Sequence, residues 1–280
     1  MAPTHALRNT PAAVVLNALE ALTEKKVPAR KRQDIHHLDP LLHSPRQNRL
    51  LAALSEKEYE TLLSHLELVR LPLGRSVYGA CDLQKYLYFL TEGIVSRFYV
   101  MENGSTAEFA ATGNEGVIGL ATFLGGNSTP SQSSVVSAGY AYRMRGDRVR
   151  GDISLGGRLP HLLLRYAMAL TIQAGQTAAC NRHHTVRQQL CSLLLASTDR
   201  LHSNEVKITQ DLIADELGVR RESVTEAMGH MQGLGVIRHS RGRVVVLNRA
   251  GLEAAACECY AVMKHEQERV ASSCSQGHGH

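Results

Sequence analysis

The stretch from Lys207 to Leu247 constrains the fold more tightly than any other part of the chain. Thr209 is a candidate N-cap for a first helix, and Gly218 supplies the left-handed residue that ends it. A second helix is expected from about Arg220 to Gln232, because apolar side chains recur there every three or four residues. This apolar stripe consists of Val224, Ala227, Met228 and Met231. Two helices joined by so short a turn predict a helix-turn-helix.

Two short strands are predicted directly after the second helix. They run over Val236–His239 and Arg243–Leu247, and they meet at the turn Ser240-Arg241-Gly242. A basic hairpin beside a helix-turn-helix is typical of winged modules that read DNA. The face of the second helix opposite its apolar stripe is polar and carries Arg221, Glu222, Thr225 and Glu226.

Composition sets broad limits on the rest of the chain. Its 280 residues favour two domains over one. The net charge of +5 permits nucleic-acid binding without demanding it. No apolar run approaches the roughly 18 residues of a transmembrane helix, so no membrane partner is expected. The six cysteines lack the spacing of a disulfide framework, which favours reduced thiols in a cytoplasmic protein.

The first part of the chain is predicted to contain two helical segments. Within the polar extension 1–46, the pair Thr10-Pro11 suits a helix start, and we expect a helix over Pro11–Glu24. Residues 47–70 also look helical, since Ser55 and Glu58 fit a capping box. The apolar stripe of that segment is Tyr59, Leu62, Leu63 and Leu66.

From Leu68 to about Met144 the apolar period changes to that of strands. Short β-rich runs are separated by glycine-containing turns, which predicts an antiparallel sandwich or roll. Val117–Leu124 is the exception and is expected to form a short helix. The predicted strands are Ser76–Tyr78, Tyr86–Thr91, Val95–Met101, Thr106–Thr112, Ser133–Ala138 and Tyr140–Met144.

Residues 158–186 return to a helical period. Leu164, Met168 and Ile172 are apolar but lie off the main seam, so the helix is expected to be buried on more than one side. One side would face the β domain and the other an equivalent helix of a second copy. The alternative is a long core helix within a monomer. A further helix is expected over 187–200, and another after Asn248.

This order of elements resembles the Crp/Fnr superfamily of bacterial transcription regulators. The resemblance covers about residues 47–250 and is most specific over Ile208–Val246. It implies an α+β protein with an N-terminal cyclic-nucleotide-binding-like β-roll, a long central dimerisation helix and a C-terminal winged helix-turn-helix. The segment Leu252–Tyr260, which holds Cys257-Glu258-Cys259, looks like an extension found in one branch. The implied parts are an extension (1–46), a sensor domain (47–157), a dimerisation helix (158–186), a winged helix domain (187–250) and a C-terminal helix with a tail (251–280).

In family members that bind cyclic nucleotides, a Gly-Glu element and a later Arg-Ser or Arg-Thr pair hold the ribose and the phosphate. Here Gly119-Leu120 and Gln132-Ser133 correspond to them, so both the glutamate and the arginine are missing. The resemblance therefore argues against tight cAMP or cGMP binding. No cysteine precedes Cys81, which excludes an N-terminal iron–sulfur ligand set of the family's oxygen sensors. We expect no cofactor.

The resemblance also assigns roles on the second helix of the winged module. Arg221 would donate to guanine O6 and N7, and Glu222 would accept from a cytosine amine. Alternatively Arg221 contacts a phosphate, and Glu222 is a first-turn carboxylate favoured by the helix dipole. Thr225 and Glu226 would face the outer bases, where Glu226 departs from the family's arginine. The expected phosphate contacts are Thr209, Arg220, Ser223, Arg238, Arg241 and Arg243.

Cys257-x-Cys259 resembles a metal pair. On a helix, residues two apart point roughly 200° apart, so we expect one buried and one exposed thiol and assign no metal site. His183 and His184 are expected at the surface. The alternative is a thiol- or metal-responsive sensor with secondary DNA binding. That alternative would use Cys257, Cys259, His265, Cys274, His278 and His280.

The favoured function is a homodimeric regulator that reads a palindromic operator in double-stranded DNA. Such a protein would contact RNA polymerase if it is an activator. A nucleophile elbow, a P-loop and a zincin histidine pair are all missing from the sequence, so an enzyme is not expected. The effector and the direction of regulation stay open at this point.

Overall fold

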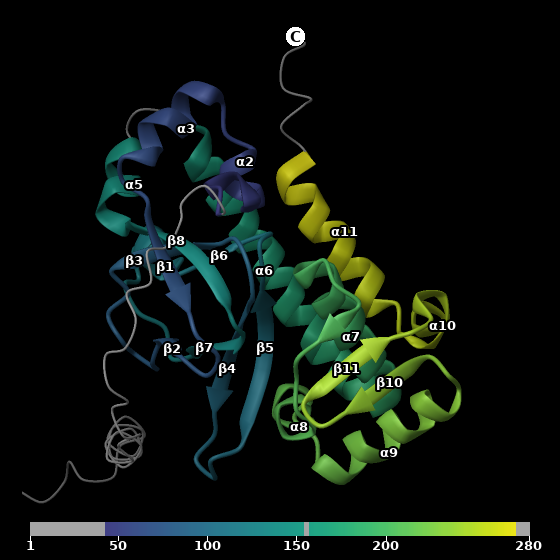
Figure 1. The fold of residues 1–280 in the computed structure, drawn as a ribbon. Helices are drawn as coiled ribbons and strands as arrows, with labels where there is room; N and C mark the ends of the chain where they lie inside the picture. The colour runs from purple at the N-terminus through teal and green to yellow at the C-terminus, as the bar shows by residue number, and fades with distance from the viewer. Residues whose placement is uncertain (1–42, 154–156, 273–280) are drawn as a thin grey trace, which may run out of the picture. The chain divides into compact units, whose positions relative to one another are not determined.

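The computed structural model describes residues 43–153 and 157–272 (Figure 1). The predicted helix Pro11–Glu24 and Cys274 lie outside these residues. The described chain opens with a 3-10 turn, η1 (Pro45–Gln47), followed by α2 (Arg49–Ala52) and α3 (Glu56–Leu63). The capping box at the start of α3 is confirmed: the Ser55 hydroxyl accepts from the Glu58 amide, and the Glu58 carboxylate accepts from the Ser55 amide.

The expectation of helix through residue 70 is wrong. α3 ends at Leu63, and residues Glu67–Leu71 form strand β1, paired antiparallel with β8 (Gly139–Arg145). Ladder hydrogen bonds to β8 decide the conformation where the side-chain pattern was ambiguous. Leu63, which was predicted to be buried, is the last residue of α3 and is 42% exposed.

Two four-stranded antiparallel sheets form the β-roll. One has the order β1-β8-β3-β6 and the other β2-β7-β4-β5. All the strands predicted from Ser76 onward are present within a few residues of their expected bounds. Besides β8, they are β2 (Ser76–Tyr78), β3 (Tyr86–Leu90), β4 (Ile94–Val100), β5 (Thr106–Thr112) and β7 (Gln132–Ser137). Strand β6 (Val117–Ile118) was not among the predicted strands.

The segment Val117–Leu124 is not one helix, contrary to expectation. β6 pairs with β3, and a short helix α4 (Ala121–Leu124) follows. Gly119 separates the two at a φ of +93°, and a Cβ there would lie 2.1 Å from the Tyr86 carbonyl oxygen. The chain can approach β3 this closely only at glycine. Helix α5 (Gly146–Ile153) was not predicted.

The long helix α6 (Arg158–His183) is confirmed, as is the following helix α7 (Val186–Leu201). One face of α6 is part of the main β-roll core, where Leu162, Leu163 and Tyr166 pack with Phe89. Between the two helices lie His184 and Thr185, and Thr185 forms a capping box that starts α7. Among the described helices, none is long and apolar enough to cross a membrane.

The winged helix-turn-helix is also present (Figure 1). Helix α8 (Gln210–Leu217) begins at the predicted cap and ends at the predicted glycine, and α9 (Arg221–Gly233) follows. The hairpin strands β10 (Ile237–Ser240) and β11 (Arg243–Val246) turn through Gly242. A third strand, β9 (Glu205–Val206), pairs with β11 and was not foreseen, because two residues carry no periodic signal.

The C-terminal segment forms two helices, whereas one helix was expected after Asn248. Helix α10 (Arg249–Ala255) ends where Ala256 adopts an extended conformation, and α11 (Cys259–Ser272) packs along α6. Because Cys257 and Cys259 are not on one continuous helix, the two thiols need not point in opposite directions. Cys257 and Cys259 are both buried, so the expectation of one exposed cysteine is wrong.

Candidate nucleic-acid interface

Helix α9 has one buried and one exposed face. The predicted apolar stripe is confirmed: Val224, Ala227, Met228 and Met231 all belong to the core of the winged domain. A packed stripe of this kind fixes the rotation of the helix about its axis. The opposite face is exposed and carries Arg221, Glu222, Thr225 and Glu226, the four residues assigned to base reading.

The exposed side chains of α9 are held loosely. Arg221 Nε lies 3.3 Å from Asp211 Oδ1, and both side chains are more than 60% exposed. Exposed pairs like this one contribute about 1 kcal/mol or less. The Thr225 hydroxyl lies 2.9 Å from Gln210 Oε1 and 3.0 Å from the Arg221 carbonyl oxygen. A ligand that binds the exposed face of α9 would therefore meet polar side chains that can exchange their present partners at little cost in free energy.

The residues assigned to phosphate contacts divide into free and engaged groups. Arg220, Arg238 and Arg241 are exposed, and none has an ion-pair partner among the described residues. Arg243 Nε pairs with Glu205 Oε1 at 3.1 Å. The Thr209 hydroxyl accepts the Leu212 amide at 3.2 Å as the cap of α8. The sixth, Ser223, is half-buried in the first turn of α9.

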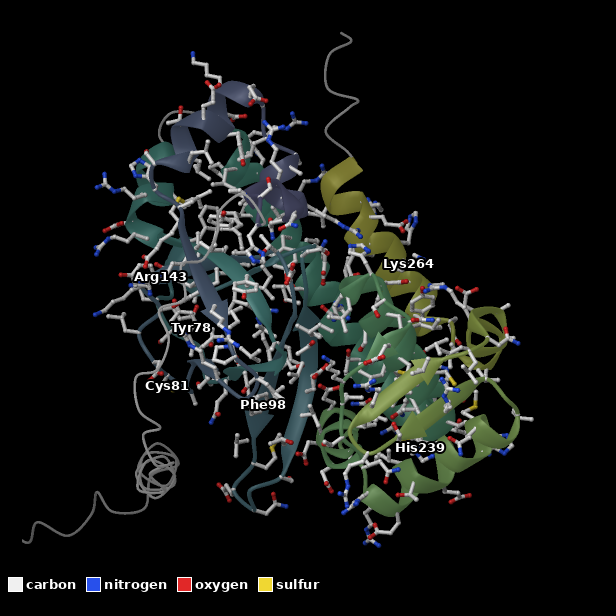
Figure 2. The ribbon with its side chains drawn as sticks, viewed as in Figure 1. Tyr78, Cys81, Phe98, Arg143, His239 and Lys264 are labelled. Carbon is white, nitrogen blue, oxygen red and sulfur yellow. The ribbon has the colours of Figure 1, made fainter. Side chains whose placement is uncertain are left out.

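A groove of about 480 Å³ brings three of the assigned residues together. Thr209 from the start of α8, Arg221 from α9 and Arg241 from the hairpin turn all line it. His239 of β10 lines the same groove and is labelled in Figure 2. The first turn of α9 also offers backbone N–H groups, since its cap residue Arg220 makes no side-chain cap.

Sequence reasoning missed His230 and His239. His230 is exposed on α9, four residues after Glu226 and on the same face, so the helical period could have revealed it. Its Nε2 lies 3.0 Å from Arg187 Nη1. His239 carried no such signal, because its place beside the groove follows from the hairpin fold.

The winged domain contacts the β-roll through a buried ion pair. Arg200 of α7 and Glu115 lie 2.9 Å apart, with side chains 7% and 5% exposed. Arg200 Nη2 also donates to the Ala111 carbonyl of β5 at 3.2 Å. Nearby, the Thr106 hydroxyl donates to the Asp215 carbonyl of α8 at 3.4 Å. Each of these contacts joins residues more than 80 positions apart in the chain.

A carboxyl group is buried at this junction. Glu108 of β5 and Glu216 of α8 line a cavity of about 370 Å³, together with Phe98, which Figure 2 labels. Glu108 Oε2 has no hydrogen-bond partner among the described residues. Burial raises the pKa of Glu108 to about 7, against the lowering effect of Ser96 and Arg200. Burial also raises the pKa of Glu216.

A second cavity, of about 580 Å³, lies between the β-roll and α6. Gly119, Leu120 and Ser133, three of the residues assigned to the degenerate ligand pocket, line it. The fourth, Gln132, does not, since alternate strand residues face opposite ways. Arg97, which sequence reasoning missed, is the charged residue among the described lining. Its guanidinium donates to Thr112 Oγ1 and to the Val117 carbonyl, both at 2.7 Å.

Comparison with known proteins agrees with this architecture. Residues 188–255 match the family described as the Crp-like helix-turn-helix domain. No curated protein matches the sequence. Among solved structures, FixK2 from Bradyrhizobium japonicum is similar with a TM-score of 0.61 and 16% identity, over 69% of this chain and 98% of that one.

Two further structures give the same result. A CRP-family transcriptional regulator from Thermus thermophilus has a TM-score of 0.57 and 20% identity, over 67% of this chain and 96% of that one. A Crp/Fnr-family protein from Eubacterium rectale has a TM-score of 0.56 and 17% identity, over 74% and 96%. The chain thus has the fold of the Crp/Fnr transcription regulators, with a Crp-like helix-turn-helix domain at residues 188–255.

Proposed function

We propose that this protein is a homodimeric transcription regulator of the Crp/Fnr type that reads a palindromic DNA operator with α9. The observation that carries the proposal is the exposed polar face of α9 on a helix-turn-helix of the matched family. Arg221 would read guanine, and Glu222 a cytosine on the opposite strand. Arg220, Arg238 and Arg241 would contact phosphates. The protein acts in the cytoplasm, without an enzymatic activity.

The dimer is supported by the exposed face of α6. Leu164 and Met168 are 52% and 63% exposed, one helical turn apart, and lie opposite the face that packs on the β-roll. Two such faces packed together would hold two copies of α9 at a fixed spacing, which a palindrome requires. The division into an extension, a sensor domain, a dimerisation helix, a winged domain and a C-terminal segment follows from the same proposal. RNA polymerase is the further partner if the protein activates.

Cyclic nucleotides are not the proposed effector. Leu120 offers no acceptor for a ribose hydroxyl, and the donors of Arg97 already bind Thr112 and Val117. A phosphate in this cavity would lack the charge-assisted partner that gives such sites their affinity. Regulation by thiols or a metal is a second candidate, favoured by the cysteine cluster described below.

Selection of bound sequences from a random DNA pool tests the reading of DNA. The full chain should enrich a two-fold symmetric site with half-sites about one helical turn apart. Arg221→Ala should lower the preference for the guanine position about tenfold or more in each half-site. Arg148→Ala is the matched control, because it removes an equal charge from an exposed position on α5. Unchanged enrichment with Arg221→Ala would sink the assignment of α9.

A further inference from the structure

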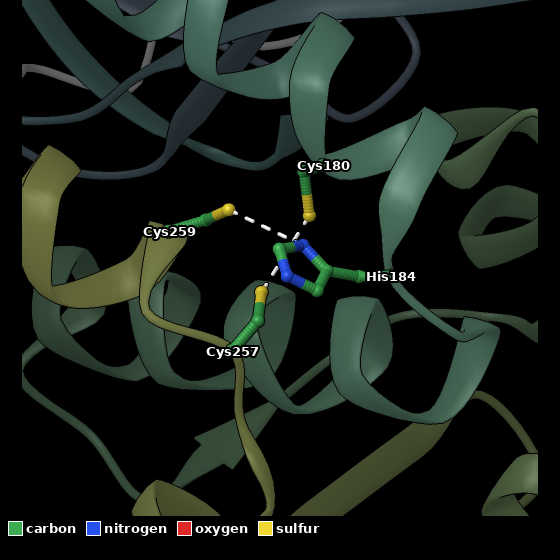
Figure 3. A group of neighbouring side chains, drawn as sticks. All are labelled: Cys180, His184, Cys257 and Cys259. Atoms are coloured by element: carbon green, nitrogen blue, oxygen red, sulfur yellow. Dashed lines mark hydrogen bonds between the residues drawn. The ribbon is translucent and has the colours of Figure 1, made fainter.

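Four potential metal ligands from two distant parts of the chain meet beside the junction of α6 and α7 (Figure 3). Cys180 and His184 lie one helical turn apart at the end of α6, so both face the same way. Cys257 lies in the break between α10 and α11, and Cys259 is the first residue of α11. The three sulfur atoms and a ring nitrogen of His184 all lie within 4.8 Å of one another.

Two of the six distances between these four atoms match the edges of a tetrahedron around one zinc ion, and all six are 4.8 Å or less. With Zn–S near 2.3 Å and Zn–N near 2.0–2.1 Å, tetrahedral geometry places two sulfurs about 3.8 Å apart and a sulfur and nitrogen about 3.6 Å apart. Cys180 Sγ and Cys257 Sγ are 3.6 Å apart. Cys259 Sγ and His184 Nδ1 are 3.5 Å apart. The cluster is thus spaced for one ion and is too compact to surround several irons.

The surroundings of the cluster also suit a metal. The amide of Gln176 donates to Cys259 Sγ at 3.0 Å, and the Ser192 hydroxyl lies 3.2 Å from Cys257 Sγ. Donors of this kind stabilise thiolates. His184 Nε2 lies 3.3 Å from Glu258 Oε1, while Nδ1 faces the sulfurs. A carboxylate that orients a ligating histidine through its other nitrogen is a recurrent companion of zinc.

We propose that Cys180, His184, Cys257 and Cys259 form a structural Cys₃His zinc site. The protein supplies a ligand for each of the four coordination positions, and three of these ligands are buried, as in closed structural sites. The site ties the end of α6 to the break before α11. Because only Thr185 separates His184 from α7, the metal fixes the angle at which the winged domain leaves the long helix. The zinc site does not depend on the proposed function. The effect of zinc on DNA binding does rest on the proposed function.

Zinc binding to the full chain is the direct test. The protein is stripped with a chelator under reducing conditions, reloaded with Zn²⁺ and assayed by elemental analysis and by competition with a chromophoric chelator. We expect one zinc per chain. Cys257→Ser and Cys259→Ser should weaken binding at least 100-fold, and Glu258→Gln about 10–100-fold, the range typical of outer-shell partners. Substoichiometric zinc in the folded, reduced wild type would overturn the proposal.

Matched variants separate this site from general thiol or histidine effects. His183→Ala replaces the exposed neighbour of His184, and Cys191→Ser alters a buried thiol of the winged domain core. Both should keep one zinc per chain. Co²⁺ in place of zinc should give the intense visible bands of tetrahedral thiolate coordination, and these should be lost in Cys259→Ser but kept in His183→Ala. This spectrum reports on the site even if a variant is less stable.

A redox pair is the rival explanation of the cluster. A Cys180–Cys257 disulfide, found by mass spectrometry in protein purified anaerobically, together with no bound zinc, would overturn the metal site. DNA binding is then compared between zinc-loaded and stripped protein. If neither form binds a specific sequence, the proposed function fails while the zinc stoichiometry stands. If the protein binds a specific DNA sequence but takes up no zinc, the zinc site alone fails.

Discussion

The arginine on the exposed face of α9 and the arginine in the β-roll cavity differ in their burial and in the partners that they already have. Arg221 on α9 is largely exposed, and its ion-pair partner Asp211 lies at 3.3 Å. Arg97 in the cavity wall is 8% exposed and makes two hydrogen bonds of 2.7 Å inside the β-roll. A ligand that recruited Arg97 would have to replace buried bonds, and leaving such groups unpaired costs free energy. Of these two arginines, Arg221 is therefore the one that can exchange its partner for a ligand at little cost, whereas Arg97 stabilises the fold of the β-roll.

The largest effect should come from breaking the buried ion pair between the two regions. Arg200→Leu leaves Glu115 buried without its partner, and a loss of this kind costs about 3–5 kcal/mol in the free energy of unfolding. Arg143→Leu is the control, because its partner Glu67 is 60% exposed and the expected loss is about 1 kcal/mol or less. Urea denaturation followed by circular dichroism measures both. Equal losses in the free energy of unfolding for the two variants would contradict the prediction that burial determines the cost of breaking each ion pair.

A pH dependence should come from Glu108 at the same junction. Burial raises the pKa of its carboxyl from 4.5 to about 7, so the folded state favours the protonated form. A carboxyl whose pKa is raised on folding gives stability that is fully present below about pH 4.5 and is lost as pH rises to about 7. We expect the free energy of unfolding to fall by about 2 kcal/mol over this window.

Comparison of variants isolates this contribution from that of other titrating groups. Glu108→Gln should remove most of the fall, since its side chain is neutral throughout. Glu60→Gln, an exposed position on α3, should leave the fall unchanged. Glu216 and Arg200 also face this carboxyl, so part of the slope should persist in Glu108→Gln. An identical slope in wild type and Glu108→Gln would contradict the assignment.

A smaller effect is expected for the phosphate contacts proposed beside α9. Arg241→Ala at the hairpin turn should weaken binding to all DNA sequences alike, by about threefold to tenfold, and lower the slope of log affinity against log salt by about one for each site. Arg221→Ala should instead change the sequence preference. Titrations at several salt concentrations distinguish the two. A change of DNA sequence preference with Arg241→Ala would contradict this assignment, because it would indicate that the hairpin reads bases.

The sequence predicted those features that are encoded over consecutive residues. The two faces of α9 follow from a 3.6-residue period, and the caps at Thr209 and Gly218 mark where α8 begins and ends. Strand β1 was mistaken for helix because its partner β8 lies about 70 residues away. The cysteine cluster could not be predicted for the same reason, since Cys180 and Cys257 are 77 positions apart in the chain. In addition, no glycine or proline marks the helix break at Ala256.

The smallest effect is expected where the family's ligand would bind. Addition of cAMP should change the DNA affinity of the wild type less than twofold, because Leu120 replaces the ribose-binding glutamate and Arg97 is engaged with Thr112 and Val117. Calorimetry with cAMP and fluorescence anisotropy on labelled operator DNA measure binding and response separately. If cAMP does bind, Arg97 is the cation available to its phosphate, and Arg97→Gln should abolish that binding. Such a result would reverse the contrast with α9, because a buried arginine would then exchange its internal partners for a ligand.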